Sequence, residues 1–439
     1  MNGTLTSDKL SAYWMPFTAN REFKKSPRII TSASGCYFKD DKGRDIYDSL
    51  SGLWTCGLGH NNKYINKAIT KQLNTLDYAP SFQFSHSYAF DLAERIASLM
   101  PHRLDKVFFT NDGSESVDTA LKMARAYWRK KGMASKTKYI GRIKGYHGVN
   151  FGGVSVGGIV GNRSLYGQGI DSDHLSHTLL KGNEFQKGLP LEGAYLAEEL
   201  NDLIALHDAS NIAAVIIEPV AGSAGVLPPP VGYLEKVREI CTKNNILLIF
   251  DEVICAFGRM GSYSAAEKFD VTPDIMTTAK QLTNGIIPMG AVISQSEIYD
   301  TFMENSGDEG VIEFPHGYTY SASPVACAAA MATLDEIERQ GIMERVNNLS
   351  PLFEESVHSL KGLPFVNDIR NYGLAAGITL EHKDNTPMKR PYDIAMSMWE
   401  KGFYVRFGGD TVQLGVPFIT TPKEVDLLVN ALGESIENS

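Results

Sequence analysis

"ILLIFDEVICAFGR", residues 246–259, runs five apolar residues straight into two acids. A short apolar run of this kind predicts a strand buried on both faces. Asp251 and Glu252 then stand where the strand ends, and a carboxylate taken out of water needs a charged or hydrogen-bonding partner. The stretch raises the question of what positive charge lies opposite these acids.

The segments around this stretch alternate between strand-like and helix-like patterns from about residue 61 to 320. "KVFFTND" precedes a segment with apolar residues at helical spacing, and "IAAVIIEP" precedes "GYLEKVREICTKNN", which leads back into "ILLIF". Apolar runs separated by helices are typical of a mainly parallel sheet covered on both faces. The sequence therefore predicts an α/β fold.

Both ends of the chain differ from this central part. Residues 1–60 are expected to be loop-rich, and after about residue 320 helical patterns flank short strands such as "AAGITLE" and "TVQLGV". We expect a large domain over residues 61–320. Residues 1–60 and 321–439 would together build a smaller α+β domain.

Composition excludes several classes of protein. The chain has 439 residues, a formal charge of -9 and no basic block, which disfavours nucleic-acid binding. Its five cysteines are odd in number and never spaced C-x-x-C, as expected of reduced thiols and of a protein without a structural metal. The stretch "MNGTLTSDKLSAYW" is polar and lacks the apolar region expected of a signal peptide, and no apolar run reaches the roughly 20 residues of a membrane helix. We expect a soluble, cytoplasmic protein.

Parallel sheets bind ligands beyond the carboxyl ends of their strands, where Asp251 and Glu252 are expected. A Mg²⁺–nucleotide site of the ATPase type would need G-x-x-x-x-G-K-[ST], and the dipeptide Gly-Lys is absent from the sequence. The dinucleotide motif G-x-G-x-x-G is absent too. A third interpretation, that the two acids only cap the next helix, stays open.

A lysine at a nearby strand end suggests a different ligand. In "TPDIMTTAKQLTNG", Lys280 follows another short β-like run. An amine and a carboxylate at neighbouring strand ends suit pyridoxal phosphate, because the amine of Lys280 can form a Schiff base with the aldehyde. The Asp251 carboxylate can then face a protonated pyridine nitrogen, which is the positive charge sought above.

Two further stretches fit parts of the same cofactor. In "TNDGSESVDTAL", Gly113 and Ser114 open an amphipathic helix whose free N–H groups suit a phosphate, although Ser114 or Ser116 could equally be a plain N-cap. In "KGYHG", Tyr146 offers a flat face for the pyridine ring. Tyr146 could also be a packing residue.

Together, "NDGSES", "GYHG", "IIEPVAGSAGVLPPPVGYL", "IFDEV", "AKQLTNG" and "HGYTYS" occur in order over nearly the whole chain. This series resembles the class III aminotransferases of the fold-type I pyridoxal-phosphate superfamily. Within that class, "YWMPFTANR", "YDSLSGLWTCGLGH" and "GFYVRFGGDT" are most similar to the ω-amino acid–pyruvate, or β-alanine–pyruvate, aminotransferases. The resemblance implies a large domain with a seven-stranded, mainly parallel sheet.

The resemblance also implies roles for single residues. Lys280 and Asp251 would be catalytic, with Lys280 binding the cofactor covalently and then moving a proton. The remaining cofactor contacts would come from Gly113, Ser114, Tyr146, Glu218, Val253 and Thr319. Thr319 would reach the phosphate of a neighbouring subunit, so that the active site lies at the interface of a dimer or tetramer.

The substrate pocket is implied by the same family. Trp54 and Trp14, the latter beside Tyr13, resemble an aromatic wall, although aromatic residues are more often part of a core. Arg406 in "YVRFGGD" matches an arginine that receives a substrate carboxylate.

Four positions depart from the family pattern. Ornithine-type relatives carry a glutamate at the position of Ser223, and its absence argues against a diamine substrate. Cys255, Ala256 and Ser323 also differ, without removing a catalytic group.

The sequence thus predicts an aminotransferase that moves the amino group of a terminal amine, β-alanine foremost, to pyruvate. Other donors such as γ-aminobutyrate or taurine remain open at this stage. So does another enzyme of the same class, such as a dialkylglycine-type decarboxylase or an aminomutase.

Overall fold

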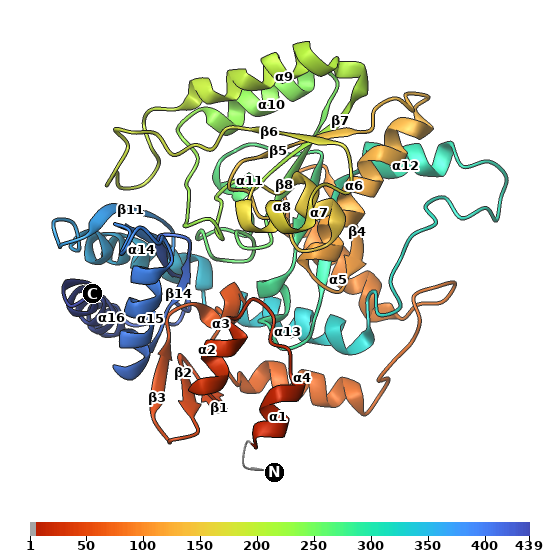
Figure 1. Ribbon diagram of the computed structural model, residues 1–439. Coiled ribbons are helices and arrows are strands. Elements are labelled where there is room, and N and C mark those ends of the chain that lie inside the picture. The colour runs from red at the N-terminus through yellow and green to blue at the C-terminus, as the bar shows by residue number, and fades with distance from the viewer. Residues whose placement is uncertain (1–5) are drawn as a thin grey trace.

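The computed structural model describes residues 6–439, and a seven-stranded sheet forms its centre (Figure 1). In spatial order its strands are β4 (Leu104–Thr110), β10 (Gly290–Gln295), β9 (Ile275–Thr278), β8 (Leu247–Asp251), β7 (Ile212–Ile217), β5 (Lys138–Arg142) and β6 (Ser172–Leu175). β10 runs antiparallel to both its neighbours, and the other pairs are parallel. The predicted α/β fold with a mainly parallel sheet is confirmed.

Uniformly apolar strands explain why helices cover both faces of this sheet. Every residue of β7 and β8 is buried. Along β8, Leu247 and Ile249 pack in a cluster with α6 (Gly113–Lys130), whereas Leu248 and Phe250 pack in the main core with α10 (Tyr233–Lys243). Because successive side chains of a strand point to opposite faces, only a sheet with two covered faces can bury all of them.

The other helices are mostly short and amphipathic. Those between residues 51 and 304 are α3 (Ser51–Trp54), α4 (Lys63–Leu73), α5 (Ser87–Leu99), α7 (Phe151–Val156), α8 (Val160–Tyr166), α9 (Glu199–His207), α11 (Ala265–Lys268) and α12 (Ser296–Glu304). At the two ends of the chain lie α1 (Ser7–Ala12), α2 (Asn20–Lys25), α13 (Pro324–Arg339), α14 (Ile342–His358), α15 (Lys389–Glu400) and α16 (Pro422–Glu437). Over residues 6–439, none of the helices has the length and apolar character needed to span a membrane.

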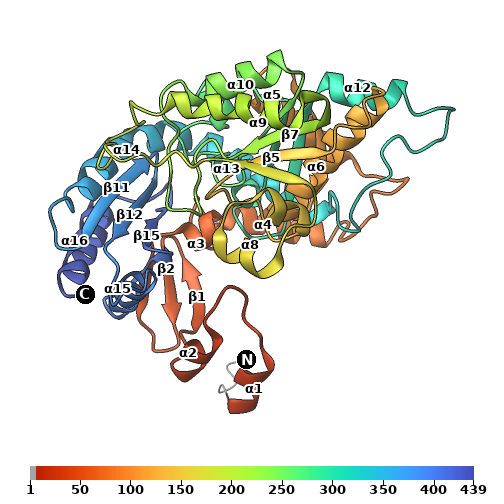
Figure 2. The ribbon, with the colours of Figure 1, turned by 45° about the horizontal axis from the view of Figure 1, so that its top comes forward.

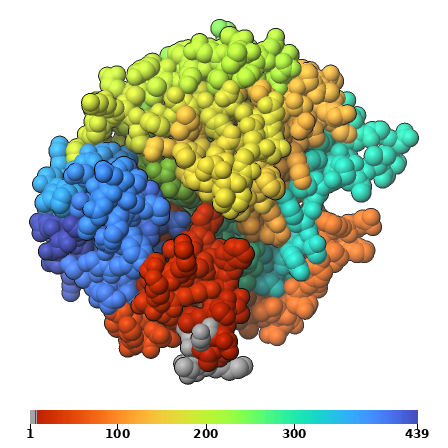
Figure 3. Space-filling model, in the orientation of Figure 1, coloured from red at the N-terminus to blue at the C-terminus, as the bar shows by residue number. Residues whose placement is uncertain are grey.

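The two ends of the chain meet in a four-stranded sheet. β1 (Ile30–Ser34), β2 (Tyr37–Asp40) and β3 (Asp45–Asp48) are antiparallel, and β13 (Phe403–Tyr404) pairs parallel with β3. The red N-terminal and blue C-terminal segments accordingly lie side by side in Figure 3. No pattern in the sequence indicates β1, because its side chains are mostly exposed and lack an apolar alternation. The domain boundaries near residues 60 and 320 stay a prediction.

A second small sheet is built from the C-terminal part alone (Figure 2). Its strands, all antiparallel, are β11 (Val366–Tyr372), β12 (Ala375–Leu380), β15 (Thr411–Leu414) and β14 (Arg406–Gly408), in that spatial order.

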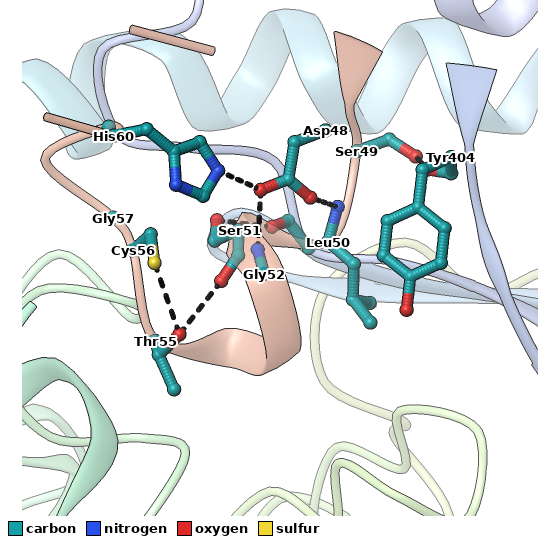
Figure 4. A network of polar contacts seen from close by, with 12 residues as sticks. Asp48, Ser49, Leu50, Ser51, Gly52, Thr55, Cys56, Gly57, His60 and Tyr404 are labelled. Carbon is teal, nitrogen blue, oxygen red and sulfur yellow. Dashed lines mark hydrogen bonds and ion pairs between the residues drawn. The ribbon is translucent and has the colours of Figure 1, made fainter. Parts of the chain in front are cut away.

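The loop after β3 is fixed by a buried carboxylate (Figure 4). Asp48 accepts hydrogen bonds from the backbone N–H groups of Leu50, at 3.2 Å, and Gly52, and its Oδ2 lies 2.7 Å from Nε2 of His60. Burial lowers the pKa of His60, but the hydrogen bonds to Asp48 and Cys56 outweigh it and raise that pKa to about 9. His60 is therefore protonated at neutral pH.

The same loop is joined to the turn that follows β9. Gln281 Oε1 accepts the N–H of Gly57 at 2.8 Å. The side chain of Asn284 accepts the N–H of Leu58 and donates to the carbonyl of Gly59, both at 2.9 Å. The buried side chains of Gln281 and Asn284, in the turn after β9, thus supply hydrogen bonds that a neighbouring strand would otherwise give to this loop.

The His60–Asp48 pair predicts a pH dependence of stability. A histidine whose folded pKa is about 9, against 6.5 unfolded, stabilises the fold fully below pH 6.5 and loses this contribution as the pH rises to 9. At about 1.4 kcal/mol per pKa unit, the contribution is on the order of 3 kcal/mol. In denaturant titrations between pH 6 and 9, His60→Gln should be least stable relative to wild type at the acidic end.

His382 provides the control for this measurement. It is 49% exposed and lies 3.9 Å from Asp410, so His382→Gln should follow the wild-type stability at every pH. If the wild-type and His60→Gln curves ran parallel from pH 6 to 9, His60 would carry no such contribution.

Candidate active site

A cavity of about 310 Å³ lies where the strands of the large sheet end. β4, β5, β7, β8 and β9 are each followed by residues that line it, as expected at the carboxyl ends of parallel strands. Seven of the residues predicted from the sequence meet here, namely Gly113, Ser114, Tyr146, Glu218, Asp251, Val253 and Lys280.

Asp251 is buried at the end of β8 with both carboxylate oxygens held. Its Oδ2 lies 2.8 Å from Nδ1 of His147. Its Oδ1 accepts the N–H of Val253 at 3.1 Å and the hydroxyl of Thr277 at 3.3 Å. Three donors from three segments therefore fix the direction in which the carboxylate faces the cavity.

The neighbouring acid has a different partner. Glu252 is fully buried and accepts the backbone N–H groups of Ala265 and Ala266 at the start of α11. Burial is the main reason that its pKa rises to about 7. The helix-capping interpretation is thus correct for Glu252, while Asp251 faces the cavity.

Lys280 stands at the end of β9 with φ 46°, a left-handed conformation that a lysine rarely adopts. Burial lowers the pKa of its amine, and Arg406 acts in the same direction, against the opposing effects of Asp251 and Glu218. A lowered pKa increases the fraction of neutral amine, which is the nucleophilic form.

Glu218 supports the other side of the cavity. Its two carboxylate oxygens accept the N–H groups of Tyr146, at 2.9 Å, and of Gly222, at 3.0 Å. Burial raises the pKa of Glu218. The residue therefore orients the segment that carries Tyr146, as well as facing the cavity itself.

The first turn of α6 forms the opposite wall. The first N–H groups of a helix have no intrahelical acceptor, and they carry the positive end of the helix dipole. A Cβ at Gly113 would lie 2.8 Å from Val253, and one at Gly148 would lie within 2.8 Å of Ser114. Only glycine permits these close approaches around the cavity.

Four of the predicted residues do not line this cavity in the single chain: Trp14, Thr319, Trp54 and Arg406. Trp14 is 89% exposed beyond α1, and Thr319 is exposed as well. Trp54 is 3% exposed, lies against Gly415, and has the guanidinium of Arg259 5.6 Å from its ring centroid.

Arg406 lies in β14, an edge strand of the second small sheet, and approaches the site from there. Its guanidinium is close enough to influence Lys280, and it opposes the effect of burial on the pKa values of Tyr146 and Tyr404. Among residues 6–439 no acidic side chain forms an ion pair with it. A ligand carboxylate at the mouth of the cavity would find a guanidinium without a carboxylate partner.

Sequence reasoning missed His147. The residue stands in the same "GYHG" turn as Tyr146, and it is the closest partner of Asp251 in the chain. Its Nε2 has no hydrogen-bond partner among the described residues. Of the residues that depart from the family pattern, Cys255 is buried and its thiol donates to the carbonyl of Val220.

Comparison with known proteins identifies the family. The model of the family described as "Aminotransferase class-III" matches residues 18–436. The chain belongs to the class III aminotransferases. It is 59% identical to a β-alanine–pyruvate aminotransferase of Pseudomonas aeruginosa, over 97% of this chain and 96% of that protein.

Two more relatives support this assignment. An ω-amino acid–pyruvate aminotransferase of Pseudomonas putida is 57% identical over 97% of this chain and 95% of its own length. The crystal structure of the ω-transaminase of Pseudomonas jessenii in complex with PMP superposes with a TM-score of 0.93 at 31% identity, covering 99% of this chain and 98% of that one. The resemblance drawn from the sequence is confirmed.

The cofactor of this class III aminotransferase is pyridoxal 5′-phosphate. The residues in the cavity fit it: an amine with a lowered pKa, a fixed carboxylate, and a helix N-terminus beside glycines that leave room for an anion.

The two adjacent acids predict separable effects. Asp251→Asn keeps the shape but removes the carboxylate that faces the cavity. Turnover should fall by about 10²-fold or more, in line with pKa effects of 1–3 units from a close opposite charge. Glu252→Gln is the matched control, because its side chain faces α11. It should change the unfolding midpoint while turnover stays within about threefold of wild type. Equal losses of turnover in both variants would contradict these separate roles.

Proposed function

We propose that this enzyme transfers the amino group of an ω-amino acid, β-alanine foremost, to pyruvate, giving L-alanine. The carrying observation is the pair of Lys280 and Asp251 in one cavity, with the guanidinium of Arg406 close enough to lower the pKa of Lys280. Both substrates are small carboxylates, and both half-reactions would use one site, so that the kinetics are ping-pong. The identity of 59% to a β-alanine–pyruvate aminotransferase supports this choice of substrates.

Lys280 would hold the cofactor and move the proton. When bound, pyridoxal phosphate supplies an aldehyde that reacts with primary amines and a ring that takes up the electrons of a broken C–H bond. The amine of Lys280 would also serve as the base that takes the proton from the substrate carbon. Its lowered pKa brings it closer to neutral pH, where a general base is most effective.

The other cavity residues would orient the cofactor. The Asp251 carboxylate would hold a proton on the pyridine nitrogen, with Val253 and Tyr146 on the two faces of the ring. The N–H groups of Gly113 and Ser114 would bind the phosphate, and Glu218 would lie beside the ring substituents.

The substrate would bind between Arg406 and an aromatic wall that includes Trp54 and Trp14. Arg406 would form a bidentate pair with the carboxylate of β-alanine or pyruvate. The position of Ser223 carries no acid that could pair with this arginine, which disfavours diamines as substrates.

We also propose that the active enzyme is a homodimer or tetramer. Thr319 and Trp14 are exposed in the single chain and lie outside its cavity, as expected if each completes the site of a second copy. Exposed aromatic side chains such as Phe84 and Tyr320 would be covered at the same interface. A monomer in sedimentation experiments with full turnover would contradict this.

Amino-acceptor dependence tests the function. The purified enzyme should consume β-alanine only when pyruvate is present, form equimolar alanine and release no CO₂. Lys280→Ala should lower turnover by more than about 10³-fold, as expected for loss of the acid–base group, while still binding the cofactor without a covalent bond. Turnover of β-alanine without any keto acid would indicate an aminomutase, and CO₂ release a decarboxylase.

Arg406→Ala tests the carboxylate receptor. Removing one member of a buried charged pair costs about 2–5 kcal/mol, so kcat/KM for β-alanine and for pyruvate should fall by about 30-fold to several thousand-fold. The half-reaction with 1-phenylethylamine, followed by the absorbance of the bound cofactor, should change far less, since that amine has no carboxylate. Arg406→Lys should restore only part of the loss. Equal losses for both amines would assign Arg406 a structural role.

A further inference from the structure

Arg406 ends a row of residues that crosses the second small sheet. In register, Arg370 of β11 is opposite Gly377 of β12, Gly377 is opposite Gln413 of β15, and Gln413 is opposite Arg406 of β14. Residues directly opposite one another point to the same face of a sheet, with Cβ atoms of antiparallel pairs about 4.5–5.5 Å apart. The side chains of Arg370, Gln413 and Arg406 therefore share one face.

A loop of the large domain, residues 222–225, lies on this face. Arg370 donates two hydrogen bonds to the carbonyl of Gly225, at 3.3 and 3.0 Å. A Cβ at Gly377 would lie 2.0 Å from that carbonyl oxygen, so the loop fits only over a glycine. Next in the row, Nε2 of Gln413 donates to the carbonyl of Ser223 at 2.8 Å.

The other end of the Gln413 amide lacks a partner. Gln413 is 1% exposed, and its Oε1 has no hydrogen-bond donor among residues 6–439. Because Nε2 is held by Ser223, the amide cannot turn to exchange its two ends without losing that bond. A buried acceptor left in this state costs about 1–3 kcal/mol unless a donor reaches it.

The nearest side chain able to supply a donor from the same row is Arg406. It is directly across from Gln413, it carries five N–H groups, and it has no carboxylate partner in the described chain. In this structure the guanidinium interacts with the side chain of Tyr404. We propose that Arg406 turns to Gln413 when a substrate without a carboxylate occupies the cavity, and that it then donates a guanidinium hydrogen bond to Oε1. This inference rests on the proposed function of Arg406.

The chemistry of an amide makes this partner weak enough to be displaced. A neutral oxygen competes poorly with a substrate carboxylate for a guanidinium, because charged hydrogen bonds are about twice as strong as neutral ones. It still gives the guanidinium an acceptor when the substrate is an amine without a carboxylate. Gln413 would thus set the balance between carboxylate-bearing and carboxylate-free substrates.

Two substitutions at this position should act in opposite directions. Gln413→Glu places a carboxylate across from Arg406, which must be displaced before a substrate carboxylate binds, so kcat/KM for β-alanine should fall by at least about tenfold relative to that for 1-phenylethylamine. Gln413→Leu removes the acceptor, so 1-phenylethylamine should lose about three- to tenfold relative to β-alanine. Both ratios come from single half-reactions followed by cofactor absorbance.

Arg370→Lys is the matched control, because Arg370 contacts the same loop from the far end of the row. Loosening the loop should reduce both half-reactions together and leave their ratio within about twofold. If Gln413→Glu and Gln413→Leu behaved like Arg370→Lys, Gln413 would only hold the loop.

Binding of propionate, which is β-alanine without its amine, gives a readout that needs no turnover. Calorimetric titration of the holoenzyme should show at least about tenfold weaker binding to Gln413→Glu and unchanged or tighter binding to Gln413→Leu. Wild-type enzyme that binds propionate, with both variants unchanged, would overturn this inference alone. Wild-type enzyme that neither binds propionate nor uses β-alanine would overturn the proposed function and this inference with it.

Discussion

The burial of one carboxylate at the end of β8 is the constraint on which the site depends. Asp251 has lost its water and is held by an imidazole, a hydroxyl and a backbone N–H from three separate segments. Each of these donors must be brought to the same strand end, which fixes where the turn with His147 and the end of β9 with Thr277 can lie. The segments that supply hydrogen bonds to Asp251 therefore also form walls of the cavity.

The two adjacent acids, Asp251 and Glu252, have different kinds of partner. Asp251 faces the cavity, while Glu252, one residue later, is turned toward the N–H groups of α11. Successive residues of an extended chain point in opposite directions, so one strand end can present one acid to a cavity and another to a helix. Glu218 likewise has two partners, because its two carboxylate oxygens accept backbone N–H groups from two different loops.

The large sheet and the cavity could be predicted from the sequence because both follow from local patterns. β7 and β8 are uniformly apolar, and the charged residues Asp251 and Lys280 interrupt apolar runs where strands end. His147 could not be found this way, because its partner is 104 residues away and a single histidine in a glycine-rich turn has no spacing signature. For the same reason Gln413, bonded to a carbonyl 190 residues distant, carried no signal.

The loop over residues 57–59 has no strand partner and takes its hydrogen bonds from Gln281 and Asn284, directly after Lys280. Because of these shared hydrogen bonds, the loop over residues 57–59 and the turn after Lys280 can be exchanged only together. A chimera that exchanges the loop between family members for a new substrate range must carry the lysine turn with it, or leave buried N–H groups without acceptors. The loop over residues 57–59 and the turn after Lys280 are therefore bound to the same three side-chain to backbone contacts.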